Sequence, residues 1–185
     1  MFKEKEIVDA YRKVQDLPKE ELDIQFKELL QKQSVALSFI VANVEQYKLE
    51  EDTKNAAAEM LFHIFNLYKI KKVDSTLTEE SIAKALNLMD VAAKSIENEI
   101  GGLSKEDVTI LNKAIESGKS DKLTGKPKVI LDAILNKKKE VKQPILLEFL
   151  SNYIFTDQLI IEKDKSFVFS IAETIVEAIE IQNKQ

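Results

Sequence analysis

The chain of 185 residues has no cysteine, a single histidine, His63, and a single arginine, Arg12. The lack of cysteine excludes disulfides, thiolate metal ligands and thiol nucleophiles. One imidazole cannot supply the two or three histidines that most catalytic zinc sites and the paired Glu-x-x-His motifs of di-iron bundles take from one chain. The sequence therefore predicts no catalytic residue, no metal ligand and no cofactor.

Helix-breaking residues are also scarce. The chain has four glycines, all within residues 101–125, and neither glycine nor proline occurs between Pro18 and Gly101. Glycine costs a helix interior about 1 kcal/mol and proline about 3 kcal/mol, so a stretch without them favours long helices. Together with the spacing of the apolar residues, this predicts an all-α fold, an antiparallel helical bundle of seven or eight helices.

Capping residues and apolar spacing give the expected helices. They cover residues 2–15, 19–47 with an optional turn near Gln33 and Ser34, about 50–70, 79–100 after a cap at Thr76–Glu79, 104–117, and a helix opened by Pro144. The stripe of Ile82, Leu86, Met89, Ala93, Ile96 and Ile100 is expected to face the core. Residues 35–44 and 82–100 are apolar on more than one side, so these helices are expected to be central or covered by a partner.

The last part of the chain allows two predictions. The apolar runs 159–161 and 167–169 flank a polar turn and would suit a small hairpin near 159–169. Ile171, Ile175 and Ile179 instead have helical spacing, which favours a helix that begins near Asp164. We expect one helical domain over residues 1–185, with an optional division into a bundle at 1–117 and a smaller helical segment at 127–185.

The chain has no segment that suits a membrane or a secretory leader. Its longest apolar run, residues 35–44, is half of the roughly 20 residues that a membrane span needs, and residues 1–6 are mostly charged. We therefore expect a cytoplasmic protein without a membrane partner. The net charge of −5 also argues against a general attraction to nucleic acid.

Glu59 and His63 are four residues apart, so their side chains can meet on one helix. They would form an acid–base or metal-binding couple, or, more simply, a pair that is solvated or touches a neighbouring helix. The helix spacing puts His63 away from the side that carries Ala57, Leu61 and Ile64, and no further metal ligands are marked. The simpler interpretation is therefore favoured.

Two groups of charged residues are candidates for a functional site: three acidic clusters and a lysine-rich segment. Acidic clusters at Glu20–Glu21, 50–52 and Glu79–Glu80 would suit a magnesium-dependent phosphohydrolase, but each lies at an expected helix start and lacks a third acid one turn later. Residues 119–142 hold eight lysines against three acidic residues. A solvated loop and helix end is the favoured interpretation, and Lys137, Lys138 and Lys139 are the candidates for an anion-binding or partner surface. That segment has no aromatic residue and no arginine, which argues against nucleic acid as its ligand.

The favoured function is a non-catalytic intracellular helical protein that binds a protein partner or associates with itself. The poor catalytic inventory and the helices that are apolar on several sides support this hypothesis. The alternatives are a phosphohydrolase on the same helical bundle that uses carboxylates and magnesium, or a phosphate or nucleic-acid binder that uses the lysines of residues 119–142.

Overall fold

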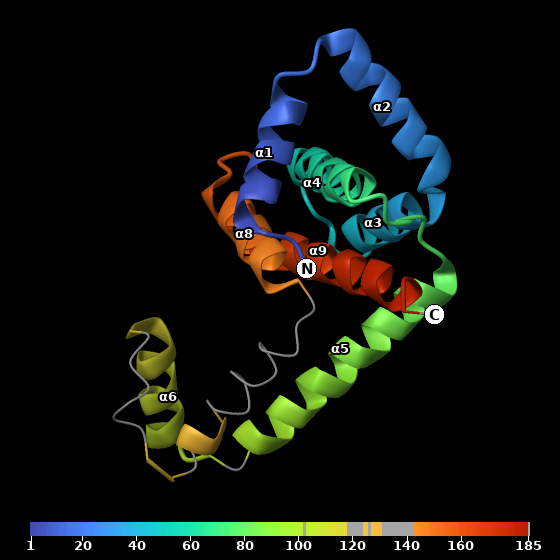
Figure 1. The fold of residues 1–185 in the computed structure, drawn as a ribbon. Coiled ribbons are helices and arrows are strands. Elements are labelled where there is room, and N and C mark those ends of the chain that lie inside the picture. The colour runs from blue at the N-terminus through green and yellow to red at the C-terminus, as the bar shows by residue number, and fades with distance from the viewer. Residues whose placement is uncertain (102, 118–123, 126, 131–142, 185) are drawn as a thin grey trace. The chain divides into compact units, whose positions relative to one another are not determined.

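The computed structural model describes residues 1–101, 103–117, 124–125, 127–130 and 143–184, and in these ranges it contains helices and no strand. The predicted all-helical bundle is confirmed (Figure 1). The helices with defined bounds are α1 (Glu4–Gln15), α2 (Lys19–Lys32), α3 (Ser34–Tyr47), α4 (Glu51–Ile70), α5 (Glu79–Ile100), α6 (Lys105–Ser117), α8 (Pro144–Thr156) and α9 (Glu162–Gln182).

The chain divides into two compact units. One unit consists of Met1–Leu86 with Ile145–Gln185, and the other of Asn87–Pro144. The first unit therefore holds α1 to α4, the first two turns of α5, nearly all of α8, and α9. The single domain and the division near residue 117 that the sequence suggested stay predictions.

Helices α4 and α9 form the centre of the first unit. α4 contacts α1, α2, α3 and α9, and it lies between the two arms formed by α1 and α2 (Figure 1). Most side chains of α9 between Val168 and Ile179 are buried, as are those of α4 between Met60 and Tyr68 except Asn66. The C-terminal helix α9 therefore packs on α4, which lies more than one hundred residues earlier in the chain.

Residues 35–44 and 82–100 were expected to be central or covered by a partner; the parts that the structure describes are not buried on all sides, and cover by a partner stays a prediction. Val41 on α3 is 53% exposed and Leu86 on α5 is 43% exposed. α3 buries only one side, through Ala36, Ile40 and Val44. On α5, Ile82 of the predicted stripe is buried, but the next residue of the stripe, Leu86, is not, and Ala85 is buried instead. Apolar composition on several sides therefore did not identify the central helices.

Residues 19–47 are divided into α2 and α3 at Gln33, so the optional turn near Gln33 and Ser34 is confirmed in place of one long helix. Gln33 leaves helical geometry, with φ −117° and ψ 36°, and is only 5% exposed. Its Oε1 accepts a hydrogen bond of 3.2 Å from the backbone N–H of Leu77, which is also buried. A buried amide that satisfies a distant backbone donor offsets the lost helical geometry, which explains a break without glycine or proline.

The second apolar run of the suggested hairpin is helical, so the hairpin prediction is wrong and the alternative helix is correct. α9 begins at Glu162, two residues before the expected start. Asp164 does not cap the helix. Its carboxyl group is buried and accepts a hydrogen bond of 3.0 Å from Oγ1 of Thr53, in the first turn of α4. This contact joins the beginnings of α4 and α9.

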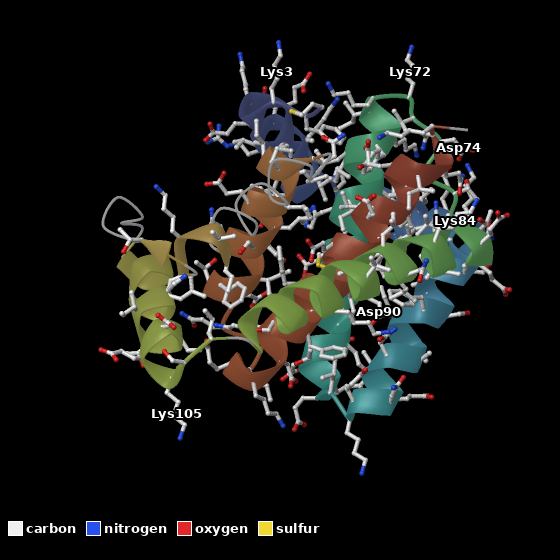
Figure 2. The ribbon with its side chains drawn as sticks, turned by 90° about the horizontal axis from the view of Figure 1, so that it is seen from below. Lys3, Lys72, Asp74, Lys84, Asp90 and Lys105 are labelled. Atoms are coloured by element: carbon white, nitrogen blue, oxygen red, sulfur yellow. The ribbon has the colours of Figure 1, made fainter. Side chains whose placement is uncertain are left out.

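Two helices end in left-handed backbone geometry without glycine. Lys48 after α3 and Lys72 after α4 have positive φ values of 52° and 55°, the left-handed geometry that glycine usually supplies at helix ends. The following N–H groups of Leu49 and Val73 donate to the carbonyls of Val44 and Tyr68, each at 3.0 Å. The Lys72 side chain points away from the ribbon, so this strained position carries a solvated residue (Figure 2).

Candidate binding groove

Three openings lie around α2, where it crosses α4 near the end of α1. Their volumes are about 480, 230 and 200 Å³. We call these openings together the α2 groove. The widest opening is lined by Val14, Gln15, Leu17, Leu22, Asp23, Phe26, Asn55, Ala58, Glu59, Phe62 and His63. The middle opening is lined by Ala10, Lys13, Val14, Leu17, Gln25, Asn66, Lys69 and Ile70. The third is lined by Gln25, Glu28, Leu29, Lys32, Gln33, Phe62, Phe65, Asn66, Lys69 and residues 73–76.

The three openings border one another. Val14 and Leu17 line both the widest and the middle opening, and Gln25, Asn66 and Lys69 line both the middle and the third. On α4 the lining residues run from Asn55 to Ile70, which is about 22 Å at about 1.5 Å per residue. The groove is therefore long and narrow and follows most of α4.

The groove exists because α2 is held by few buried side chains. Leu29 is the one buried residue of α2, while Leu22 is 36% exposed and Phe26 is half-buried. The Phe26 ring lies 5.8 Å from the Phe62 ring of α4, centroid to centroid. Leu22, Phe26 and Leu29 follow helical spacing and face the rest of the unit, but they do not fill the space beneath the helix.

The widest opening has mostly apolar walls and a negative edge. Val14, Leu17, Leu22, Phe26 and Phe62 supply apolar surface. Its ionised groups are the carboxylates of Asp23 and Glu59, and neither lysine nor arginine lines it. Apolar walls with a few converging polar groups are typical of binding sites in proteins.

His63 forms part of the wall of this opening. The residue is 4% exposed, and neither ring nitrogen has a hydrogen-bond partner. Its Nε2 lies 3.7 Å from Oε1 of Glu59, and its ring lies 4.7 Å from the Tyr11 ring of α1, centroid to centroid. The predicted pairing of Glu59 with His63 is confirmed in its second form, a pair that touches a neighbouring helix. The expectation that His63 lies away from the packed side of its helix is wrong.

The ionisation of these groups follows from their burial. Loss of water contact lowers the pKa of His63 below 6.5, and the nearby Glu59 carboxylate only partly opposes this effect. Burial raises the pKa of the Tyr11 and Tyr153 hydroxyls, and the charge of Glu59 raises it further. At neutral pH the site therefore presents a neutral imidazole and neutral phenols around one carboxylate.

The burial of His63 predicts a loss of stability in mild acid. The unfolded chain binds a proton on this imidazole near pH 6.5, whereas the folded chain binds it only at lower pH. Protons therefore favour the unfolded state, and the free energy of unfolding should fall as the pH drops below about 6.5. His63→Phe keeps an aromatic ring but does not titrate, so it should lose less stability between pH 7 and pH 5. Urea unfolding of both proteins at each pH measures the difference.

Other titrating groups do not disturb this comparison. Burial raises the pKa of Glu173, which adds stability as the pH falls, but it does so equally in both proteins. Parallel stability curves for the two proteins from pH 7 to pH 5 would show that His63 does not have the lowered pKa that its burial predicts.

In the third opening the charges of the acidic residues are balanced by those of two lysines. Glu28 accepts hydrogen bonds from Nζ of Lys32 at 2.7 Å and from Nζ of Lys69 at 2.9 Å. These two contacts lower the pKa of Glu28 to about 2. The carboxylate therefore stays ionised and paired, which contrasts with the carboxylates of the widest opening.

The residues singled out from the sequence do not form a second site in the described ranges. Lys137, Lys138 and Lys139, with most of residues 119–142, lie outside the described residues. The acidic clusters fall in or next to the first turns of α2, α4 and α5, as expected. Among the residues that the structure describes, no three His, Asp or Glu side chains come together in a way that could hold a metal ion. No helix in these ranges is both long enough and apolar enough to cross a membrane.

Comparison of the chain with models of protein families, with curated proteins and with solved structures gives no match. The functional argument therefore rests on the geometry of the groove and on the chemistry of the side chains that line it.

Proposed function

We propose that this protein is a non-catalytic interaction module, located in the cytoplasm, that binds an amphipathic helix of a partner protein in the α2 groove. The observation that carries the proposal is the α2 groove itself: three adjoining openings along about 22 Å of α4, with apolar walls beneath a loosely packed helix. A small molecule would need one compact cavity. A helix of about 15 residues has a matching length.

Incomplete burial of α2 supports this function. Leu22 and Phe26 keep part of their apolar surface exposed at the widest opening. Each square ångström of apolar surface removed from water contributes about 25 cal/mol to binding. An apolar side chain of a partner that enters between these residues and Phe62 would bury surface on both molecules.

The alternatives have less support. An enzyme that uses carboxylates and magnesium needs several converging acids, and the described residues offer no such group. A phosphate or nucleic-acid site at Lys137, Lys138 and Lys139 stays a prediction, because these residues lie outside the described ranges. Self-association is a second form of the same function, in which another copy of the chain supplies the helix.

Filling the groove should weaken the proposed binding. Ala58 lines the widest opening, so Ala58→Trp places an indole where the partner's side chain would enter. A fluorescently labelled amphipathic peptide of about 15 residues, with leucines along one face, should bind the natural protein and bind this variant about tenfold more weakly, which is about 1.4 kcal/mol. Fluorescence anisotropy measures both affinities.

Ala83→Trp on the exposed side of α5 is the matched control, and it should leave the affinity unchanged. Sedimentation equilibrium without peptide shows whether a second copy of the chain already occupies the groove. If the peptide fails to bind a monomeric protein, or if both tryptophan variants weaken binding equally, the proposed function is wrong.

A further inference from the structure

We propose that the bound helix carries a lysine next to its apolar residues, and that the ammonium group of this lysine binds between Asp23 and Glu59 at the widest opening of the α2 groove. This inference rests on the proposed function and specifies the chemistry of the partner. It predicts a basic amphipathic helix rather than an acidic or neutral one.

The first argument is uncompensated negative charge. Asp23 and Glu59 come from different helices, α2 and α4, and line the same opening. The Glu59 side chain is 50% exposed, and its neighbours are the imidazole of His63, at 3.7 Å, and the hydroxyl of Tyr153, which is uncharged. Burial keeps that imidazole neutral at pH 7, so it does not balance the carboxylate. No lysine or arginine lines the opening to do so.

The second argument is the unsatisfied imidazole. His63 is buried in the wall of the same opening, and both of its ring nitrogens lack a hydrogen-bond partner. Buried polar groups in proteins are nearly always paired, so an exception calls for an explanation. An ammonium group has three donors. Bound at Glu59, with a small rotation of that side chain, it can offer one donor to Nε2 of His63 while the others reach the carboxylates.

The remaining parts of the groove restrict the ammonium group to this position. Lys13 and Lys69 line the middle opening and would repel a second cation there. In the third opening, Glu28 is already paired with Lys32 and Lys69, so the two acidic residues there, Glu28 and Asp74, are matched by two lysines. The apolar walls at Leu22, Phe26 and Phe62 line the same opening as Asp23 and Glu59, so one apolar residue and one lysine on adjacent turns of a helix would reach both features.

Three peptides test the inference. They share the leucine face used above and differ at one flanking position, which is lysine, norleucine or glutamate. The lysine peptide should bind about tenfold more tightly than the glutamate peptide, with the norleucine peptide between them. This preference should shrink at about 1 M salt, where the Debye length is about 3 Å.

Variants of the protein locate the effect. In Asp23→Asn and in Glu59→Gln the preference for the lysine peptide over the glutamate peptide should fall to about threefold or less. Asp23 is exposed, so its variant keeps the test valid if the second one folds poorly. Glu21→Gln, an exposed position of α2 outside the groove, is the matched control and should keep the full preference.

The possible failures are distinct. If none of the three peptides binds, the proposed function fails and the inference fails with it. If all three bind with equal affinity, or if Glu21→Gln reduces the preference as much as Asp23→Asn does, the groove binds helices but the lysine site is refuted.

Discussion

Replacing Phe2 with alanine should lower the free energy of unfolding by about 3 kcal/mol, although the residue is the second of the chain. Phe2 is only 3% exposed. Its ring meets the Tyr68 ring of α4 edge to face at a centroid distance of 5.1 Å, and Nζ of Lys71 lies 5.4 Å from the Phe2 centroid. The variant loses apolar burial, an aromatic pair and a cation–π contact together.

Thermal unfolding followed by circular dichroism measures this effect, which should appear as a drop in Tm of about 6–12 °C. Met1→Ala is the matched control. Met1 is 76% exposed, so its replacement should leave the Tm nearly unchanged. If the two variants unfold at the same temperature as the natural protein, the N-terminal residues are not anchored on α4.

Replacing Thr53 with valine should lower the free energy of unfolding by about 2–3 kcal/mol. The substitution keeps the shape of the side chain but removes the hydroxyl that donates to Asp164 at 3.0 Å. Both residues are buried, with exposures of 0% and 3%. The carboxyl group would then lack its donor in the interior, which costs more than the loss of a solvated hydrogen bond.

A double-mutant cycle tests this explanation by urea unfolding. Asp164→Leu removes the buried carboxyl group, so adding Thr53→Val to that variant should cost far less than it does in the natural protein. Thr156→Val is the control, because the Thr156 hydroxyl donates to a carbonyl of its own helix and the residue is exposed. Equal costs for Thr53→Val with and without Asp164 would show that the hydrogen bond does not join α4 to α9.

Local signals in the sequence predicted most helix positions. Ser104 caps α6 as expected: its Oγ accepts from the N–H of Asp107 at 3.1 Å, and the two side chains are also hydrogen-bonded. The cap of α5 was placed two residues too early. The hydroxyl of Thr78, not that of Thr76, accepts from the N–H of Ser81 at 3.1 Å. Capping depends on neighbouring residues, which explains why sequence reasoning came close in both cases.

Contacts between residues far apart in the chain could not be predicted from the sequence. The break at Gln33 depends on a hydrogen bond with Leu77, and the start of α9 is tied to Thr53 of α4. Neither pairing has a local signature. The burial of His63 likewise depends on α1 packing against a side of α4 that helix spacing alone marked as outward.

The α2 groove was also missed, for a geometric reason. Leu22, Phe26 and Leu29 indicate that α2 is amphipathic, but they do not show how completely that face is covered. Coverage depends on the angle between α1 and α2, which separate from their short connection and leave α4 between them (Figure 1). The sequence instead indicated a different candidate surface, at Lys137, Lys138 and Lys139, which lies outside the described residues.

The central claim is that a basic amphipathic helix occupies the α2 groove, and mapping the bound lysine peptide by NMR tests it most directly. With ¹⁵N-labelled protein, the largest changes in backbone amide shifts should fall on Leu22, Phe26, Ala58 and Phe62, and the ring nitrogens of His63 should shift as they gain a donor. Amides of the outer side of α3, such as Val41, should stay in place. Saturable binding with shifts centred on α3 or spread evenly over the unit, and with an unchanged His63, would contradict the account.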